Sequence, residues 1–233
     1  MKNTPERPGI SYTLIRSRRK TCAIHITKAA TVEVRAPLRM HAKDIDRFVA
    51  SKAQWIKSHQ ESARRRTSEQ AAFLLNYRDT VQLYGIHYPL VAKTGDHAGF
   101  DGNCIYLPPR LTSEGIRQAV MCVFKAAAKG YLPAKTASFA ALMDVVPSAV
   151  RISGAKTRWG SCSAKNSISY SWRLIMADDD VVDYVVVHEL AHIKVRNHSP
   201  AFWAVVEGVL PDYKARQKKL RQLQKTLSTQ NWD

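Results

Sequence analysis

The stretch HELAHIKVRNHSPAFW, residues 188–203, places three histidines and a glutamate within eleven residues. Its first five residues fit the pattern HExxH. On a helix, residues four apart lie on one face, about 6 Å from each other. His188 and His192 can therefore offer two imidazole nitrogens to one tetrahedral Zn²⁺. Glu189 lies about 100° round the helix from His188, outside the ligand set but within reach of a metal-bound water.

The position of Glu189 suits a general base. This carboxylate would accept the proton of the water as the water attacks a carbonyl, and would pass that proton to the leaving amine. The pattern therefore predicts a zinc metallopeptidase of the HExxH type, with one catalytic Zn²⁺ and a polypeptide substrate.

A catalytic zinc needs a third protein ligand and an open position. In a continuous helix, His198 would lie about 9 Å along the axis from His192, so the chain must turn between them. Asn197 tolerates a left-handed cap, and Ser199 followed by Pro200 fits the start of a new helix. Basic side chains suit a helix C-terminus, and two precede the expected turn: Lys194 and Arg196.

Other interpretations of this stretch stay open. Glu207 would serve as third ligand in a glutamate-type zinc peptidase, and Asp212 is a weaker candidate. The segment could also be a buried helix whose histidines are satisfied core groups. A strand over 181–187 is compatible with its valines, but the strand pattern does not continue through ELAHIK.

The chain carries a large positive charge. Its 233 residues include 36 Lys and Arg against 19 Asp and Glu, a formal net charge of +17. Such a charge predicts attraction to polyanions, with nucleic acid as a possible partner. A basic surface without a partner stays an alternative, because charge alone discriminates poorly between partners.

Residues 1–10 lack the apolar segment of a secretory signal. No run approaches the roughly 18 apolar residues of a membrane span, and none of the four cysteines lies in a CxxC pair. We therefore expect a cytoplasmic, reduced protein with no membrane association. Its oligomeric state is left open.

The N-terminal third predicts a basic subdomain. Alternating segments at 22–26 and 31–37 indicate an antiparallel hairpin, and apolar residues at helical spacing predict a helix over 41–62. This helix should end near the basic run at 64–66, and the polar residues 67–70 suit a joint. The expected domains are a basic β-hairpin and helix subdomain, residues 1–75, and a peptidase core, residues 76–233.

The remainder predicts a mixed α+β domain. A helix is expected over 113–142, with Ser113 as N-cap and an interruption or kink at Pro133. From Asp179 the pattern is helical through the histidines, and two more helices follow. The expected short strands lie at 81–92, with its turn at Gly85, and at 104–108, 149–153 and 167–172.

Four segments occur in a fixed order: KTRWGSCS at 156–163, a strand at 168–174, DYVVVHELAH at 183–192 and NHSPAFW at 197–203. Together they resemble the YgjP-like metallopeptidase family, which is related to the SprT-like zinc peptidases. The resemblance also takes in SRRKTCAIHI, AAKGYLP and PDY, and so covers nearly the whole chain.

This resemblance implies an α+β, zincin-like metallopeptidase core, with the HExxH helix packed on a small antiparallel sheet. It also implies zinc ligands at His188, His192 and His198 and a catalytic Glu189, positions that the spacing favours independently. Two residues depart from the family pattern and put local substrate contacts in doubt: Ser171, where relatives often have Asn, and Asp178, where many have Pro.

The segment RWGSCS, residues 158–163, has two interpretations. Arg158 could steady an oxyanion, Trp159 could wall a cleft, and the segment could form an edge strand that pairs with an extended peptide. Alternatively, Trp159 is a core residue and Arg158 a structural or solvated charge. Gly160 permits the close approach of another backbone. Tyr184, one turn before His188, is either core or a hydrogen-bond partner of a ligand histidine.

A nucleic-acid-binding module with a structural zinc is the main alternative function. A structural zinc is held by four protein ligands, and only three are evident here. SprT-like relatives include proteases that act on DNA-bound proteins, so the two hypotheses can combine. A pseudoenzyme is disfavoured by the intact Glu189. The alternative rests on the basic last helix and on an N-terminal basic group: Arg16, Arg18, Arg19 and Lys20.

Overall fold

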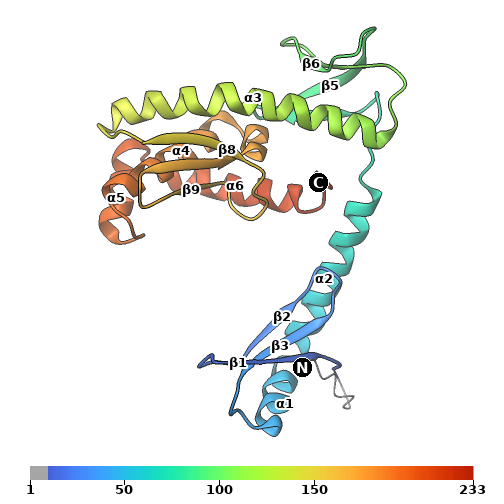
Figure 1. Ribbon diagram of the computed structural model, residues 1–233, viewed down its shortest axis with the longest axis vertical. Helices are drawn as coiled ribbons and strands as arrows, with labels where there is room; N and C mark the ends of the chain where they lie inside the picture. The colour runs from blue at the N-terminus through green and yellow to red at the C-terminus, as the bar shows by residue number, and fades with distance from the viewer. Residues whose placement is uncertain (1–9, 233) are drawn as a thin grey trace. The chain divides into compact units, whose positions relative to one another are not determined.

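The computed structural model describes residues 10–232 (Figure 1). Residues 1–9, in which no secretory signal is expected, lie outside the described part. The chain divides into two compact units. The N-terminal unit comprises the residues up to Phe73 together with Ser228–Asn231, and the C-terminal unit comprises Leu74–Leu227 with Trp232. Within residues 10–232, no helix is both long and apolar enough to span a membrane.

A three-stranded sheet forms half of the N-terminal unit. The predicted antiparallel hairpin is confirmed as β2 (Ala23–Ile26) and β3 (Val32–Pro37). A third strand, β1 (Thr13–Ser17), pairs in parallel with β3 on its other side, giving the order β1-β3-β2. β1 was not predicted from the sequence, because its partner lies some twenty residues away and no hairpin turn marks it.

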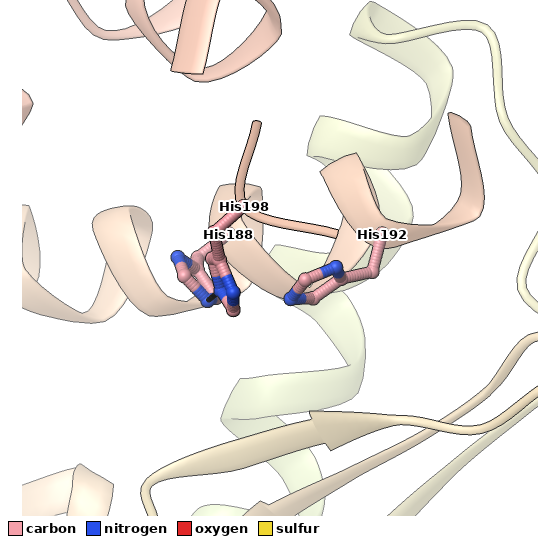
Figure 2. A group of neighbouring side chains, drawn as sticks. All are labelled: His188, His192 and His198. Atoms are coloured by element: carbon pink, nitrogen blue, oxygen red, sulfur yellow. Dashed lines mark hydrogen bonds between the residues drawn. The ribbon is translucent and has the colours of Figure 1, made fainter. Parts of the chain in front are cut away.

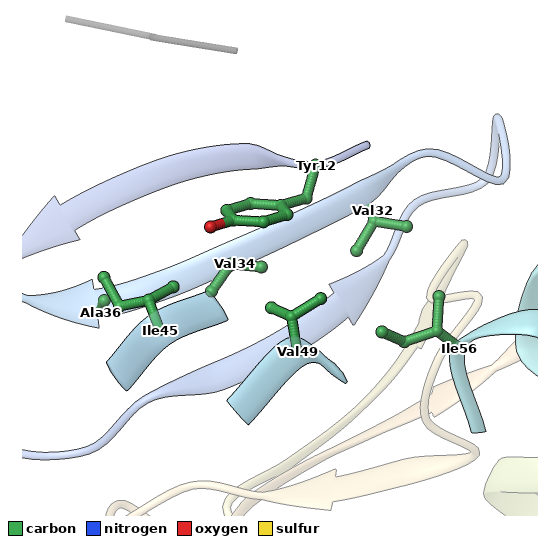
Figure 3. Packing of buried hydrophobic residues seen from close by; sticks show 7 residues of the cluster. All are labelled: Tyr12, Val32, Val34, Ala36, Ile45, Val49 and Ile56. Carbon is green, nitrogen blue, oxygen red and sulfur yellow. The ribbon is translucent and has the colours of Figure 1, made fainter. Parts of the chain in front are cut away.

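Two helices cover one face of this sheet: α1 (Ala42–Ser51) and α2 (Ala53–Ala72). The break at Lys52 divides the single helix that was predicted. The prediction of an end near residue 62 and a joint at 67–70 was wrong, because this segment is rich in helix-forming Arg, Glu, Gln and Ala and contains no Gly or Pro. Sheet and helices enclose a small core (Figure 3), whose buried members are Tyr12, Val32, Val34, Ala36, Ile45, Val49 and Ile56.

A four-stranded sheet begins the C-terminal unit. Its strands are β4 (Thr80–Leu83), β5 (Ile86–Ala92), β6 (Gly99–Phe100) and β7 (Ile105–Leu107), in the order β4-β5-β7-β6. The predicted turn at Gly85 is confirmed: this glycine has φ +79° and joins the antiparallel strands β4 and β5. A Cβ here would lie 2.7 Å from the Asp178 Cα, so the turn packs directly against the backbone at Asp178.

Helix α3 (Ser113–Leu142) is one continuous helix of 30 residues. Its N-cap is Thr112 and not the predicted Ser113, because the Thr112 hydroxyl accepts a hydrogen bond from the Gly115 amide at 3.2 Å. The interruption predicted at Pro133 was also wrong. Leu132 and Thr136, on either side of the proline, are fully buried, so packing holds the helix through this point.

The third sheet contains β8 (Ala149–Ser153), β9 (Gly160–Cys162) and β10 (Ser167–Ser171). The prediction of a small antiparallel sheet is corrected here, because the sheet is mixed. β10 pairs antiparallel with β9 and in parallel with β8. The loop after β8 carries the chain past the place that β10 then fills, which leaves β9 at an edge.

A 3₁₀ helix, η1 (Trp172–Met176), leads into three helices: α4 (Asp179–Lys194), α5 (Pro200–Val209) and α6 (Tyr213–Leu227). All three were predicted. α4 packs against α3, α5, α6 and β9, and α3 also packs along β8. The result is a mixed α+β fold with the HELAH segment at its centre.

Ion pairs reinforce the start of α4. Lys135 of α3 lies 2.8 Å from Asp179 and from Asp183, and Lys219 of α6 lies 2.7 Å from Asp180. Acidic groups near a helix N-terminus also complement the helix dipole. These contacts hold the helix in place at the end opposite its histidines.

Candidate metal centre

Three histidines converge on one point (Figure 2). His188 and His192 come from the last turns of α4, and His198 comes from the loop between α4 and α5. Each offers one nitrogen, and these three atoms lie within 4.8 Å of one another. The Nε2 atoms of His188 and His198 are 3.1 Å apart. Within residues 10–232, this is the one group of His, Cys, Asp or Glu side chains with the spacing of a metal site.

The chain turns between His192 and His198, as the analysis required, but by a different cap. α4 ends at Lys194, and Val195 leaves it in an extended conformation with φ −134°. The left-handed cap predicted at Asn197 is therefore wrong. Ser199 and Pro200 do begin α5 as predicted, although the Ser199 side chain makes no capping hydrogen bond.

The His192 ring is fixed by its own loop. Its Nδ1–H donates to the Val195 carbonyl at 3.3 Å, a bond that places the proton on Nδ1 and leaves Nε2 as an acceptor. This carbonyl is exposed by the end of α4, so the turn after the helix also sets the orientation of the second histidine.

A phenylalanine forms the floor of the cluster. Phe202 is fully buried, and its ring centroid lies 5.0, 4.5 and 4.8 Å from those of His188, His192 and His198. Trp203 packs beside His188 and His198 and stacks on Tyr213. This role of Phe202 was not predicted from the sequence, although its position four residues after His198 on a new helix was the available signal.

The local environment keeps His188 and His192 neutral. Burial, together with the neighbouring His192 and His198, lowers the pKa of His188 to about 3. Burial also lowers the pKa of His192. A histidine binds a metal through the lone pair of its neutral form, so these shifts favour metal binding over protonation.

Glu189 is buried beside the cluster, with 6% of its surface exposed. Burial raises the pKa of its carboxyl to about 7, while the Arg158 charge acts in the opposite direction. Its side chain lies against Gly160 of β9, where a Cβ would fall 2.5 Å from Oε1. The glycine was expected to admit a neighbouring backbone; it admits this carboxylate.

The residues present fit a bound metal ion. Three imidazoles are a donor set that zinc accepts. The His188 Nε2 atom faces His198 Nε2 and is therefore the atom that would bind the metal. Among the described residues, the buried Nδ1 atom of the same ring has no hydrogen-bond partner. Tyr184 does not supply it: its ring lies 5.8 Å from that of His188, and its hydroxyl accepts from Gln217.

The alternative third ligands lie outside the cluster. Glu207 is exposed, and the Asp212 carboxylate accepts from Arg216 at 2.9 Å. The two departures from the family pattern have structural partners. The buried Ser171 hydroxyl donates to the Ala155 carbonyl at 2.6 Å. Asp178 lies at the N-cap position of α4 without a side-chain capping bond, and its carboxylate lies 3.8 Å from Lys219.

Of the two predicted substrate contacts, Arg158 is exposed and its charge acts on Glu189. Trp159 is half-buried, and its carbonyl accepts from the Ser171 amide at 2.8 Å. The structure thus places Arg158 near the glutamate, and fixes Trp159 through its backbone. Their roles toward a substrate stay predictions.

Fold and site together describe a metallopeptidase: a histidine cluster on a buried helix, next to a buried carboxyl. The chain belongs to the YgjP-like metallopeptidase family, whose model, described as "YgjP-like, metallopeptidase domain", matches residues 20–223. The family resemblance seen in the sequence is thereby confirmed.

Two crystal structures of metallopeptidase zymogens are similar to parts of this chain. One is abylysin of Pyrococcus abyssi, with 24% identity, a TM-score of 0.37 and coverage of 39% of this chain and 92% of that chain. The other is jannalysin of Methanocaldococcus jannaschii, with 19% identity, a TM-score of 0.36 and coverage of 41% and 96%. These TM-scores are too low to support a structural argument. No curated protein sequence matches the chain.

Proposed function

We propose that this protein is a zinc-dependent endopeptidase of zincin-like type, in which His188, His192 and His198 hold the metal and Glu189 is the general base. The observation that carries the proposal is the convergence of three imidazoles beside a buried carboxyl. A bound zinc would supply a Lewis acid that polarises the scissile carbonyl and acidifies water.

The proton-transfer role falls to the Glu189 carboxylate. Its pKa, raised by burial to about 7, is near the value at which a group both accepts and releases a proton at neutral pH. It would take a proton from the attacking water and deliver it to the departing amine. Gly160 leaves room for this carboxylate, and Arg158 favours its charged form.

Edge strand β9 is our candidate for binding the polypeptide. One side of β9 is paired with β10, and among residues 10–232 no strand pairs with its other side. An extended peptide can add to such an edge through backbone hydrogen bonds. Since β9 also contacts α4 at Glu189, a peptide bound there would lie next to the proposed base.

The decisive experiment combines metal analysis with proteolysis of a denatured protein substrate. Wild type should retain about one zinc per chain and cleave the substrate. The variant Glu189→Gln, which keeps the shape of the side chain but cannot accept the proton, should keep the zinc and lose cleavage by at least about 100-fold. Cleavage by Glu189→Gln at the wild-type rate would refute the role of this residue.

A second candidate function, binding of nucleic acid, rests on the distribution of charge. Residues 10–73 carry 14 Lys and Arg against 5 Asp and Glu. Arg16 is engaged within the fold, because its guanidinium donates to the carbonyls of Pro37, Leu38 and Met40. Other cations are exposed: Arg18, Lys20, Arg64, Arg65 and Arg66. Such a surface would bring the peptidase to nucleic-acid-associated proteins.

This second proposal is tested by titrating DNA and RNA binding against salt. Phosphate contacts give an affinity that falls steeply with ionic strength. Proteolysis with and without DNA then shows whether the two activities are linked. Absence of binding at low salt would eliminate the nucleic-acid proposal and leave the peptidase proposal intact.

A further inference from the structure

Arg196 lies in the loop between α4 and α5, two residues before His198. Its guanidinium reaches the turn that joins β9 to β10. One NH group donates to the Ser163 carbonyl at 2.9 Å, and the other donates to the Ala164 carbonyl at 3.4 Å and to the Asn166 side-chain oxygen. The two NH groups of one guanidinium thus donate to three oxygens of a single turn, a geometry that an arginine supplies and a lysine does not.

The turn that Arg196 holds is itself well defined. Asn166 has φ +59°, and its amide donates to the Ser163 carbonyl at 2.9 Å. The Ser167 amide donates to the Ser163 hydroxyl at 3.1 Å. The turn is closed by its own hydrogen bonds. Hydrogen bonds from Arg196 to this turn therefore also restrict the position of the short strand β9.

The hydrogen bonds of Arg196 connect the two parts of the proposed active site. On one side, the loop carries His198 and the Val195 carbonyl that orients His192. On the other side, β9 carries Gly160, against which the Glu189 carboxyl is packed. Arg196 therefore spans from the histidine-bearing loop to the strand that contacts the candidate base.

We propose that Arg196 is a positioning residue that clamps the β9–β10 turn to the histidine-bearing loop, and so fixes the edge strand relative to the metal centre. This inference rests on the proposed peptidase function for its catalytic consequence, but the clamp itself is a structural claim. His188 and His192 lie on α4, and His198 packs against the buried Phe202 of α5, so we expect metal binding to persist without Arg196.

The simplest alternative is that Arg196 is an exposed cation without a structural role, on a chain that has many cations. Exposed ion pairs contribute little, but these bonds go to backbone carbonyls and an amide and involve no carboxylate. A second alternative is that Arg196 contacts the substrate directly. A substitution of Asn166 distinguishes these hypotheses, because Asn166 belongs to the proposed clamp and accepts a hydrogen bond from Arg196.

The test is a double-mutant cycle on the zinc-loaded, full-length protein, with Arg196→Ala, Arg196→Lys, Asn166→Gly and the double variant. Glycine at position 166 keeps the left-handed turn, since it adopts positive φ without strain. We expect full zinc content in all four variants and a fall in kcat/KM of about 10-fold for Arg196→Ala. Arg196→Lys should restore little of this loss, and the double variant should be no worse than Arg196→Ala.

A second readout does not depend on activity. Hydrogen exchange at the amides of residues 160–167 should be roughly 10-fold faster in Arg196→Ala than in wild type. Faster exchange together with non-additive effects supports the clamp. Unchanged exchange overturns it, and so does wild-type kcat/KM in Arg196→Lys. Strictly additive effects overturn it in favour of direct substrate contact. If wild type cleaves no peptide, the proposed function fails while the exchange measurement still decides the clamp.

Discussion

Helices α2 and α4 have comparable lengths, 20 and 16 residues, but are stabilised in different ways. α4 buries nine of its residues, whereas Ile56 is the buried residue of α2. One of the nine is Glu189, a carboxyl whose burial costs free energy and is tolerated because the surrounding packing supports the helix. α2 depends on helix propensity and on local pairs such as Arg65 with Glu69. Tertiary packing thus provides the rigid element on which functional side chains are held.

The largest effect should come from removing a histidine of α4. His192→Ala leaves two imidazoles, which should reduce the zinc content after dialysis from about one per chain to near zero. The matched control is His59→Ala on α2, whose ring bonds to the Trp55 carbonyl one turn earlier and which should leave the metal content unchanged. Full zinc stoichiometry in His192→Ala would contradict the ligand assignment.

A smaller effect is expected from the strand packed against α4. In Gly160→Ala, the added methyl would lie 2.5 Å from Glu189 Oε1, so the carboxyl or the strand must shift. A displacement of about 1 Å near the reacting groups costs on the order of 100-fold in rate. Kinetics on a peptide substrate should show this loss in kcat, with the zinc retained.

The control for this variant is Gly130→Ala in α3. Apart from its chain neighbours and the nearby backbone of α3, no described atom lies within 4 Å of the position that its Cβ would occupy, and alanine is the better helix former by about 1 kcal/mol. Gly130→Ala should therefore cleave at the wild-type rate. If Gly160→Ala also cleaved at the wild-type rate, the close approach of Gly160 to Glu189 would not contribute to catalysis.

Local patterns predicted the elements that depend on local physics. The α4 helix and the start of α5 at Ser199 and Pro200 follow from periodicity and from the preference for proline at the first helical position. The cap that ends α4 does not, because Val195 and not Asn197 ends the helix. The parallel pairing of β1 and the mixed third sheet do not, because such pairings join segments distant in the sequence. The contacts of Phe202 and Arg196 were missed for the same reason.

The smallest predicted effect concerns α2 and tests whether helix propensity stabilises it, in contrast to the packing that stabilises α4. Ser68 is exposed and lies in the segment that was expected to be a joint. The variants Ser68→Ala and Ser68→Gly differ there by about 1 kcal/mol in helix propensity. If propensity sustains this part of α2, amides of residues 64–72 should exchange roughly five times faster in the glycine variant. Zinc content and cleavage should be equal in both, because these functions depend on α4. Equal exchange in the two variants would show that packing stabilises this part of α2 as it does α4, and the distinction between the two helices would not hold.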